Sequence, residues 1–324
     1  MNANKNGSVS DFVFLLVDRF SMIAFASAVE PLRVANRMAQ SQLYRWSLAS
    51  EDGEAATCSN GTKVLVERSL DDVDRDAMII VCAGLDVKAA TTQPALSWLR
   101  RQSRRGVAIG AVCTGTYLLV RAGLLDNSRC TIHWENRESL REEFPEIDLT
   151  NRIFERDGNR WTCAGGAAPA DMMLHAITEA HGRELTSLVV DQLVLTPIRS
   201  EDDEQRLSVP ARVGVRHPKL TTVIQTMEQN IEEPISPSEL ARQVGMSTRQ
   251  LERLFRRYLN KSPKRYYMGL RLQRARNLLL QTDMTVINVA LACGFTSPSH
   301  FSKCYRNHYG RTPYRERGVA SVES

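Results

Sequence analysis

The chain has 324 residues, of which 43% are hydrophobic and 24% are charged, and its formal net charge is +5. This length corresponds to about two domains that each bury a core, so the composition excludes a disordered chain. Nowhere do about 18 apolar residues follow one another, which excludes a membrane partner and predicts a soluble, cytoplasmic protein. The seven cysteines form no closely spaced pair, so we expect reduced thiols. We expect no metal and no cofactor.

The first two thirds of the chain alternate apolar runs with helical patterns. Residues 12–17, 78–82 and 107–112 are nearly continuous apolar runs, typical of strands in a parallel sheet that is buried on both faces. Helical patterns lie between and after them, at residues 21–38, 94–104, 115–122, 135–143, 169–181 and 184–195. This alternation predicts an α/β domain over residues 11–197, with a parallel sheet covered by helices as in flavodoxin-like folds.

The last third of the chain differs from the rest in pattern and in charge. Residues 198–218 contain charge runs and no sustained periodicity, so we expect a linker there. The predicted second domain, residues 219–318, is purely helical and carries 17 Lys and Arg against 7 Asp and Glu, whereas residues 1–218 carry 25 against 29. A basic field of this size attracts a polyanion such as double-stranded DNA, although a solvated basic surface would give the same count.

The second domain contains an internal repeat. Ala241 and Gly245 recur as Ala290 and Gly294, and the apolar positions of the next helix also recur. A small residue where two helices cross, followed by a glycine at the turn, is typical of helix-turn-helix geometry. The residues from Ser247 to Gln250 match the capping box that begins a helix. We therefore predict an all-α domain with two helix-turn-helix units.

The second helix of each unit is predicted to enter the major groove of DNA. In residues 248–259 the arginines would face outward, because four residues would face the core: Leu251, Leu254, Phe255 and Tyr258. Arginine suits guanine and glutamine suits adenine. The proposed DNA-binding residues are Thr248, Arg249, Gln250, Arg253 and Arg256 in the first unit and Ser299, His300, Ser302, Lys303 and Arg306 in the second. Phosphate contacts, which position the protein without reading sequence, are assigned to Arg257, Lys264 and Arg265.

Two groups of motifs resemble a known family of regulators. Residues 294–306 (GFTSPSHFSKCYR) and 309–313 (YGRTP) resemble the signature of AraC/XylS-type regulators. Upstream, residues 28–33 (AVEPLR), 111–116 (AVCTGT) and 133–135 (HWE) resemble the class I amidotransferase-like, PfpI-type domain of the GlxA subfamily.

The resemblance covers about residues 11–317, and within the subfamily the chain is most similar to activators of glycine betaine, carnitine and arginine catabolism. It implies a sequence-specific activator of catabolic genes that responds to a small amino-acid or quaternary-amine inducer. It also implies RNA polymerase as a partner, and we expect a homodimer.

Residues 107–115 have the pattern of a strand, a tight turn and a helix. Such a turn displays Cys113 at the carboxyl edge of the sheet, where open α/β sheets bind ligands. A hydrolase or amidotransferase-like enzyme with a DNA-binding appendage would use Cys113 with His133 and a glutamate, Glu30 or Glu135. Because Thr114 stands where PfpI-type enzymes place a histidine, we predict a vestigial elbow, no catalytic residue and no enzymatic activity. The structural alternative for Cys113 is a small buried hydrophobe.

The ligand-sensing hypothesis gives the same residues a different task. Backbone N–H groups at the elbow would hold a carboxylate, and Trp134 would face a cationic headgroup. The proposed ligand-binding residues are Glu30, Cys113, Thr114, Gly115, His133, Trp134, Glu135, Gly165 and Gly166. Core packing is the alternative for Trp134, and pairing with Arg33 is the alternative for Glu30. A third hypothesis is a ligand-independent DNA binder whose first domain is structural.

Overall fold

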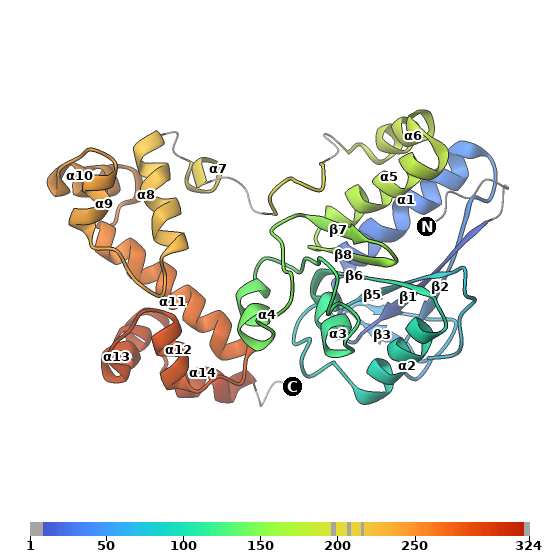
Figure 1. Ribbon diagram of the computed structural model, residues 1–324, viewed down its shortest axis with the longest axis horizontal. Helices are drawn as coiled ribbons and strands as arrows, with labels where there is room; N and C mark the ends of the chain where they lie inside the picture. The colour runs from blue at the N-terminus through green and yellow to red at the C-terminus, as the bar shows by residue number, and fades with distance from the viewer. Residues whose placement is uncertain (1–8, 196–198, 206–208, 215–216, 321–324) are drawn as a thin grey trace. The chain divides into compact units, whose positions relative to one another are not determined.

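The computed structural model describes residues 9–195, 199–205, 209–214 and 217–320 (Figure 1). The chain divides into two compact units, residues 1–205 and residues 206–324. The first is an α/β unit and the second is a helical unit, and each is described here by itself. None of the described helices is long and apolar enough to cross a membrane.

The α/β unit is built on a six-stranded sheet with the strand order β2-β1-β5-β6-β8-β7. The strands are β1 (Ser10–Leu16), β2 (Tyr44–Ala49), β5 (Met78–Cys82), β6 (Ala108–Val112), β7 (Phe154–Asp157) and β8 (Arg160–Cys163). All neighbouring pairs are parallel except β7 and β8 at one edge, which are antiparallel. A separate antiparallel hairpin joins β3 (Ala56–Thr57) to β4 (Lys63–Val64).

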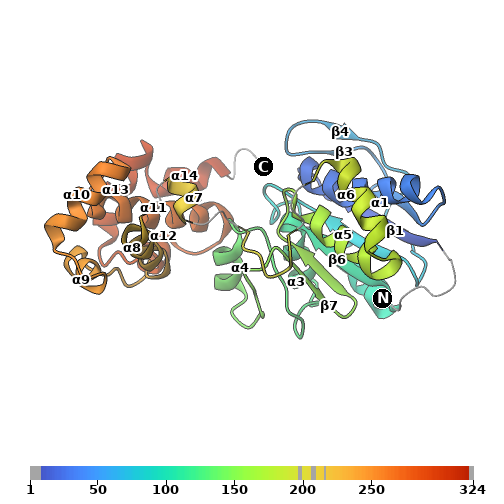
Figure 2. The same cartoon turned by 90° about the horizontal axis from the view of Figure 1, so that it is seen from above.

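Helices cover both faces of this sheet (Figures 1 and 2). One face is covered by α1 (Met22–Ala39), α5 (Ala168–His181) and α6 (Arg183–Leu193), and the other by α2 (Gln93–Arg104) and α3 (Thr116–Arg121). Helix α4 (Arg137–Glu143) lies beside α3, where Glu143 accepts a hydrogen bond from Tyr117. Side chains of β1 alternate between two cores: Phe14 packs with α1 and α5, whereas Leu15 packs with α2 and α3. Burial on both faces explains why the strand is a continuous apolar run. The predicted parallel α/β fold is confirmed.

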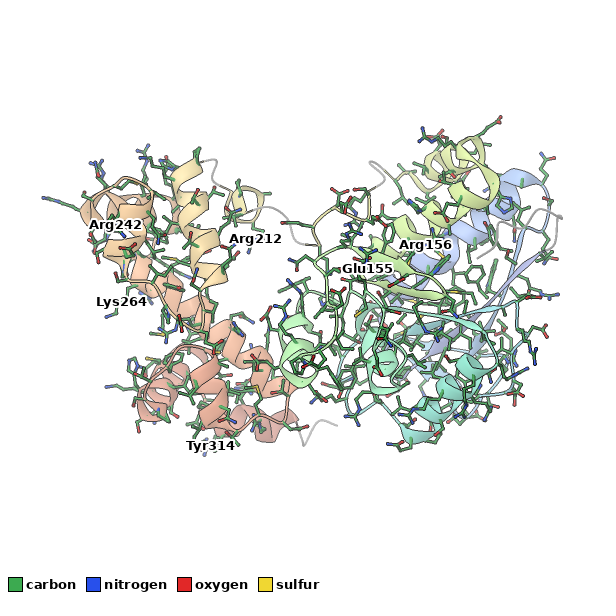
Figure 3. The ribbon with its side chains drawn as sticks, in the orientation of Figure 1. Glu155, Arg156, Arg212, Arg242, Lys264 and Tyr314 are labelled. Atoms are coloured by element: carbon green, nitrogen blue, oxygen red, sulfur yellow. The ribbon has the colours of Figure 1, made fainter. Side chains whose placement is uncertain are left out.

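The segment expected as a linker contains structure that belongs to each unit. Residues 199–205, which we call the strap, lie against the α/β unit. Residues Val209–Val213 form α7, where Val209 is 4% exposed in the core of the helical unit. Arg212, labelled in Figure 3, donates from α7 to the Glu228 carboxylate. The expected linker also includes residues 198, 206–208 and 215–216, which lie outside the described part of the chain.

The helical unit consists of two similar sets of helices joined by one long helix. The first set is α8 (Pro218–Gln229), α9 (Pro237–Gln243) and α10 (Thr248–Leu259), and the second is α12 (Val286–Ala292), α13 (Pro298–Tyr309) and α14 (Pro313–Ala320). Between them runs α11 (Pro263–Gln281), whose Tyr267 belongs to the first core and whose Leu272 and Ala275 belong to the second. The turn between α9 and α10 contains Gly245 at φ 62°, and the turn between α12 and α13 contains Gly294 at φ 73°. Both helix-turn-helix units therefore have the predicted left-handed glycine.

Candidate DNA interface and ligand site

Helix α10 presents a cationic face because only one side of it is buried. Leu251 and Phe255 are fully buried, while Arg249, Arg253 and Arg256 are exposed. Tyr258, which was expected to face the core, is 37% exposed and lies against His217 at a ring distance of 5.9 Å. That expectation is wrong, although position 258 lies on the same helical face as position 251. Phe255 is the last buried residue of α10, and Tyr258 stands one residue before the helix ends at Leu259.

Gln250 has a structural role in addition to its predicted contact with a base. Its side-chain oxygen accepts from the Ser247 backbone N–H at 2.8 Å, while Ser247 Oγ accepts from the Gln250 N–H at 3.2 Å. This is the predicted capping box, and it uses one of the two lone pairs of the amide oxygen and fixes its direction. Gln250 can therefore contact a base only in the orientation that the capping box sets.

Helix α13 presents a less charged surface than α10. Phe301 and Tyr305 are fully buried, and they leave Ser299, Lys303 and Arg306 exposed. Two of the predicted residues are less free than expected from the sequence. Ser302 is half-buried, and His300 Nε2 lies 3.4 Å from Cys304 Sγ on the next turn of the helix.

The residues assigned to phosphate contacts lie at one end of the first helix-turn-helix unit. Lys264 and Arg265 are exposed in the first turn of α11, and Figure 3 labels Lys264. Arg257 is exposed near the end of α10, with its guanidinium 5.4 Å from the Tyr258 ring centre. All three are cations at a helix end and remain available to a polyanion.

We expect two substitutions in this unit to affect DNA binding differently. Arg249→Ala should lower the preference for the cognate sequence over random DNA by about tenfold or more, because it removes a base-reading donor. Lys264→Ala should weaken binding to both DNAs by a similar factor and reduce the salt dependence, because it removes a phosphate contact. Fluorescence anisotropy with both DNAs at two salt concentrations measures this. Equal losses on both DNAs for the two variants would contradict the assignment.

Cys113 occupies the predicted elbow after β6. It adopts φ 60°, which is unusual for a residue other than glycine, and its side chain is 8% exposed. Thr114 donates to the Gly84 carbonyl at 2.7 Å, which ties the elbow to the turn after β5. Gly165 is required beside it, because a Cβ at that position would lie 2.7 Å from the Cys113 Cβ. The elbow is therefore a tightly packed turn.

The electrostatics of the elbow do not favour a nucleophile. Burial raises the pKa of Cys113 to about 11, the nearby Glu135 charge also raises it, and a hydrogen bond from the Thr114 backbone only partly opposes them. Burial also lowers the pKa of His133, against the influence of Glu135. A reactive cysteine needs the opposite, a thiolate held beside a cation. At neutral pH the thiol is therefore protonated.

Alkylation should reveal this protonation state. At pH 8 we expect Cys113 to react with iodoacetamide at least about a hundredfold more slowly than the half-buried Cys304, and the rate to increase as the pH approaches 11. Mass spectrometry of the two peptides over time gives both rates. Rapid labelling of Cys113 at neutral pH would support the hydrolase hypothesis instead.

The segment after the elbow brings two further predicted residues to it. The His133 backbone N–H donates to the Cys113 carbonyl at 3.3 Å, and the Trp134 ring lies 5.6 Å from the His133 ring. Trp134 is 39% exposed, so core packing does not account for it. Glu30 instead pairs with Arg33 at 2.6 Å, as the alternative for that residue anticipated.

Two exposed apolar side chains, Ile23 and Leu85, were missed by sequence reasoning. Ile23 is 59% exposed at the start of α1, and Leu85 is 52% exposed beside Gly84, the glycine that Thr114 contacts. The backbone N–H of Leu85 donates to Arg19, just before α1. An apolar side chain left in water indicates a binding surface, but only the fold shows that Ile23 and Leu85 are exposed.

The strap is attached to the α/β unit at two points that flank the elbow. Arg199 holds Asp171 in the first turn of α5 through three hydrogen bonds of 2.7–3.0 Å, and Asp171 is 6% exposed. The Gln205 amide donates to Thr131 Oγ1 at 2.8 Å and to the Ile132 carbonyl at 2.9 Å. Residues 131 and 132 immediately precede His133, and α5 begins just after Gly165 and Gly166.

A cluster of charged residues around Arg152, of which only Glu155 is buried, holds the middle of the strap. Arg152 makes an ion pair with Asp202 at 2.6 Å and with Glu201 at 3.4 Å, and it also lies 3.6 Å from Glu155. Glu155 is 1% exposed on β7 and is labelled in Figure 3. A buried carboxylate without a nearby cation lowers the stability of the fold. Arg152 therefore stabilises Glu155 in the sheet and binds the strap at the same time.

Comparisons with known proteins agree with both halves of this description. The DJ-1/PfpI family matches residues 12–179, and a helix-turn-helix domain family matches residues 240–318. The HTH-type transcriptional regulator GbdR of Pseudomonas aeruginosa is 45% identical over 97% of this chain and 85% of its own length. CdhR of the same species, also an HTH-type transcriptional regulator, is 45% identical over 97% of this chain and 93% of its own. The crystal structure of an AraC family transcriptional regulator from Pseudomonas putida covers 57% of this chain and 99% of its own, with 27% identity and a TM-score of 0.51.

An α/β unit with a nucleophile-type elbow, followed by two helix-turn-helix units, defines a two-domain DNA-binding protein. The chain belongs to the AraC/GlxA-type transcriptional regulators, with a DJ-1/PfpI domain in its N-terminal part. The predicted family is confirmed, and so is the function of a DNA-binding transcriptional regulator. Because the relatives that match along almost the whole chain are named as regulators, the chain is a regulator and not an enzyme.

Proposed function

We propose that the protein is a cytoplasmic, ligand-responsive activator of catabolic genes, in which the α/β unit over residues 11–197 binds an inducer and residues 219–318 bind the operator. The observation that carries the proposal is the strap. The stretch of chain that leads to the DNA-binding unit is held at Asp171 and Thr131, on the two segments that border the Cys113 elbow. A ligand that shifts either segment changes the affinity of the strap for the α/β unit, and this supplies the differential contact that regulation requires.

The chemistry of the elbow favours a small zwitterion as the inducer. Thr114, Gly115, Gly165 and Gly166 would supply backbone N–H groups for a carboxylate. Trp134, with the Glu135 charge next to it in sequence, would face a cationic amine. Amino acids and betaines have both groups, and the family resemblance points to the same compounds.

In this proposal α10 and α13 are the two recognition helices, with the base-reading residues assigned above. They would occupy successive major-groove sites on one side of the duplex, about one helical turn apart. A homodimer would duplicate this site, and RNA polymerase would be the partner at the promoter. The exposed arginines of α10 support this assignment.

The test is a thermal-shift screen of the full-length protein with glycine betaine, dimethylglycine, carnitine, choline and arginine. We expect saturable stabilisation by at least one compound, because a ligand that binds only the folded state raises stability by mass action. Trp134→Ala should abolish the shift and leave DNA binding intact. Mass spectrometry should recover the compound unchanged, whereas its consumption would favour the enzyme hypothesis.

A second variant tests the role of the strap in the same assay. Gln205→Ala removes the amide that reaches residues 131 and 132, so it should retain the thermal shift but weaken the effect of the ligand on operator affinity. Ser200→Ala is the matched control, because Ser200 Oγ bonds Asp203 within the strap itself. If Gln205→Ala responds like the wild type, regulation does not pass through the strap.

A further inference from the structure

Two sets of packed side chains connect α11 to the recognition helices, one to α10 and one to α13. Phe255 of α10 packs on Tyr266 of α11 at a ring distance of 5.6 Å. Five residues further along α11, the Arg271 guanidinium lies 4.1 Å from the centre of the Phe295 ring, and Phe295 packs on Phe301 of α13 at 5.0 Å. Phe255, Phe295 and Phe301 are each at most 1% exposed, so these contacts are close-packed.

Arg271 also binds the turn of the second helix-turn-helix unit. Its Nε donates to the Cys293 carbonyl at 2.8 Å, and its Nη2 donates to the Gly294 carbonyl at 2.7 Å. These carbonyls follow the C-terminal end of α12, where a cation is favourable. Two hydrogen bonds and one stacked ring fix the guanidinium plane, so Arg271 holds the turn in one orientation relative to α11.

The same turn also packs tightly against the first helix-turn-helix unit. A Cβ at Gly294 would lie 2.7 Å from the Ile231 and Glu232 carbonyl oxygens and 2.7 Å from Pro234 Cδ. Residues 230–235 connect α8 to α9, and Tyr267 of α11 holds them. Its hydroxyl donates to the Asn230 carbonyl and accepts from the Ile235 N–H at 3.4 Å.

The two turns of the repeat therefore differ in their surroundings. At Gly245, the equivalent position in the first unit, the nearest atom to an added Cβ is Lys219 Nζ at 3.9 Å. The turn at Gly294 thus packs against the first helix-turn-helix unit, whereas the turn at Gly245 makes no such contact with the second. We call Tyr267, Arg271 and Gly294 the brace.

We propose that the brace fixes the separation and angle of the two recognition helices, so that the protein selects operators by the spacing between two half-sites as well as by their sequence. Arg271 is its central positioning residue. The proposal rests on α10 and α13 being the recognition helices. One inserted base pair moves a half-site by about 3.4 Å and rotates it by about 35°. A rigid pair of helices cannot follow that displacement, but a pair with a loosened junction can.

The experiment uses the full-length protein and an operator that the wild type selects from a random DNA library. Binding is measured on this operator and on a version with one base pair inserted between the half-sites. The wild type should lose about tenfold or more in affinity on the inserted version. Arg271→Ala should bind the original operator more weakly, and its two affinities should lie within about threefold of each other.

Three further variants separate positioning from general loss of structure. Arg271→Lys keeps a cation and should retain part of the spacing penalty, while Tyr267→Phe removes only the hydroxyl that holds residues 230–235. Asn277→Ala is the control on the same helix, because Asn277 bonds Gln273 one turn away, and it should keep the full penalty. A variant that is only less stable loses affinity equally on both DNAs.

Two results would overturn the proposal. One is a full spacing penalty in Arg271→Ala, and the other is a wild type that binds both DNAs equally well. A wrong assignment of the recognition helices would give a different result. In that case Arg249→Ala and Arg306→Ala would leave the sequence preference at each half-site unchanged.

Discussion

Gly165→Ala should lower the free energy of unfolding of the α/β unit by about 3 kcal/mol and abolish any response to an inducer. The new Cβ would lie 2.7 Å from Cys113 Cβ and 2.8 Å from Cys113 Cα, and Gly165 has φ 92°. Cys113 is itself held at φ 60° and is 8% exposed, so it has little room to withdraw. Both the strain and the clash therefore fall on the elbow.

The neighbouring Gly166→Ala is the matched control. Gly166 also has a positive φ, 59°, but an added Cβ would meet no atom within 4 Å. It should cost only about 1 kcal/mol. All four tryptophans lie between residues 46 and 161, so tryptophan fluorescence during urea unfolding reports the α/β unit in the intact chain. Equal destabilisation by the two variants would show that the contact with Cys113 is not the cause.

Gly294→Ala should destabilise the helical unit by about 3 kcal/mol and strongly reduce DNA binding. Three atoms of residues 231, 232 and 234 lie 2.7 Å from the position of the new Cβ, and two of them are backbone oxygens. Either the turn at Gly294 or the connection between α8 and α9 must move. That movement would displace α13 relative to α10.

Gly245→Ala is the control within the repeat, because it has the same left-handed conformation and open surroundings. It should cost only about 1 kcal/mol. Circular dichroism follows both units, and subtraction of the fluorescence transition isolates the helical one. If the two substitutions were equally harmful, the contact between the units at Gly294 would have no energetic role.

The strands and helices that the sequence predicted well are those with long apolar patterns. The runs at residues 78–82 and 107–112 coincide with β5 and β6, because burial on both sheet faces requires apolar residues at every position. The edge strand β7 (FERD) and its neighbour β8 (RWTC) were not predicted. They are four residues long and partly charged, and Arg156 on β7 stacks on Trp161 of β8 at 4.2 Å. Only the pairing of the two strands explains their residues.

The site residues that could be predicted are likewise those that lie in long periodic patterns. The cationic face of α10 could be predicted because helical periodicity places Leu251 and Phe255 on the opposite side. The strap could not be predicted, because a run of acidic residues from Glu201 to Glu204 is typical of a solvated loop. Arg152, which forms ion pairs with the strap, is about fifty residues away in sequence. Contacts over such a distance cannot be predicted from local sequence patterns.

A two-domain regulator can be recombined into a chimera that carries a different DNA-binding domain. The strap determines where the two parts of such a chimera must be joined. A junction at residue 197 would leave Asp171 as a carboxylate that is 6% exposed and has lost the Arg199 guanidinium. A donor sequence grafted there would need to rebuild the contact with Thr131 as well. A junction after Gln205 keeps the whole strap with the α/β unit. A foreign DNA-binding domain joined there would therefore follow a strap whose contacts with the α/β unit are all intact.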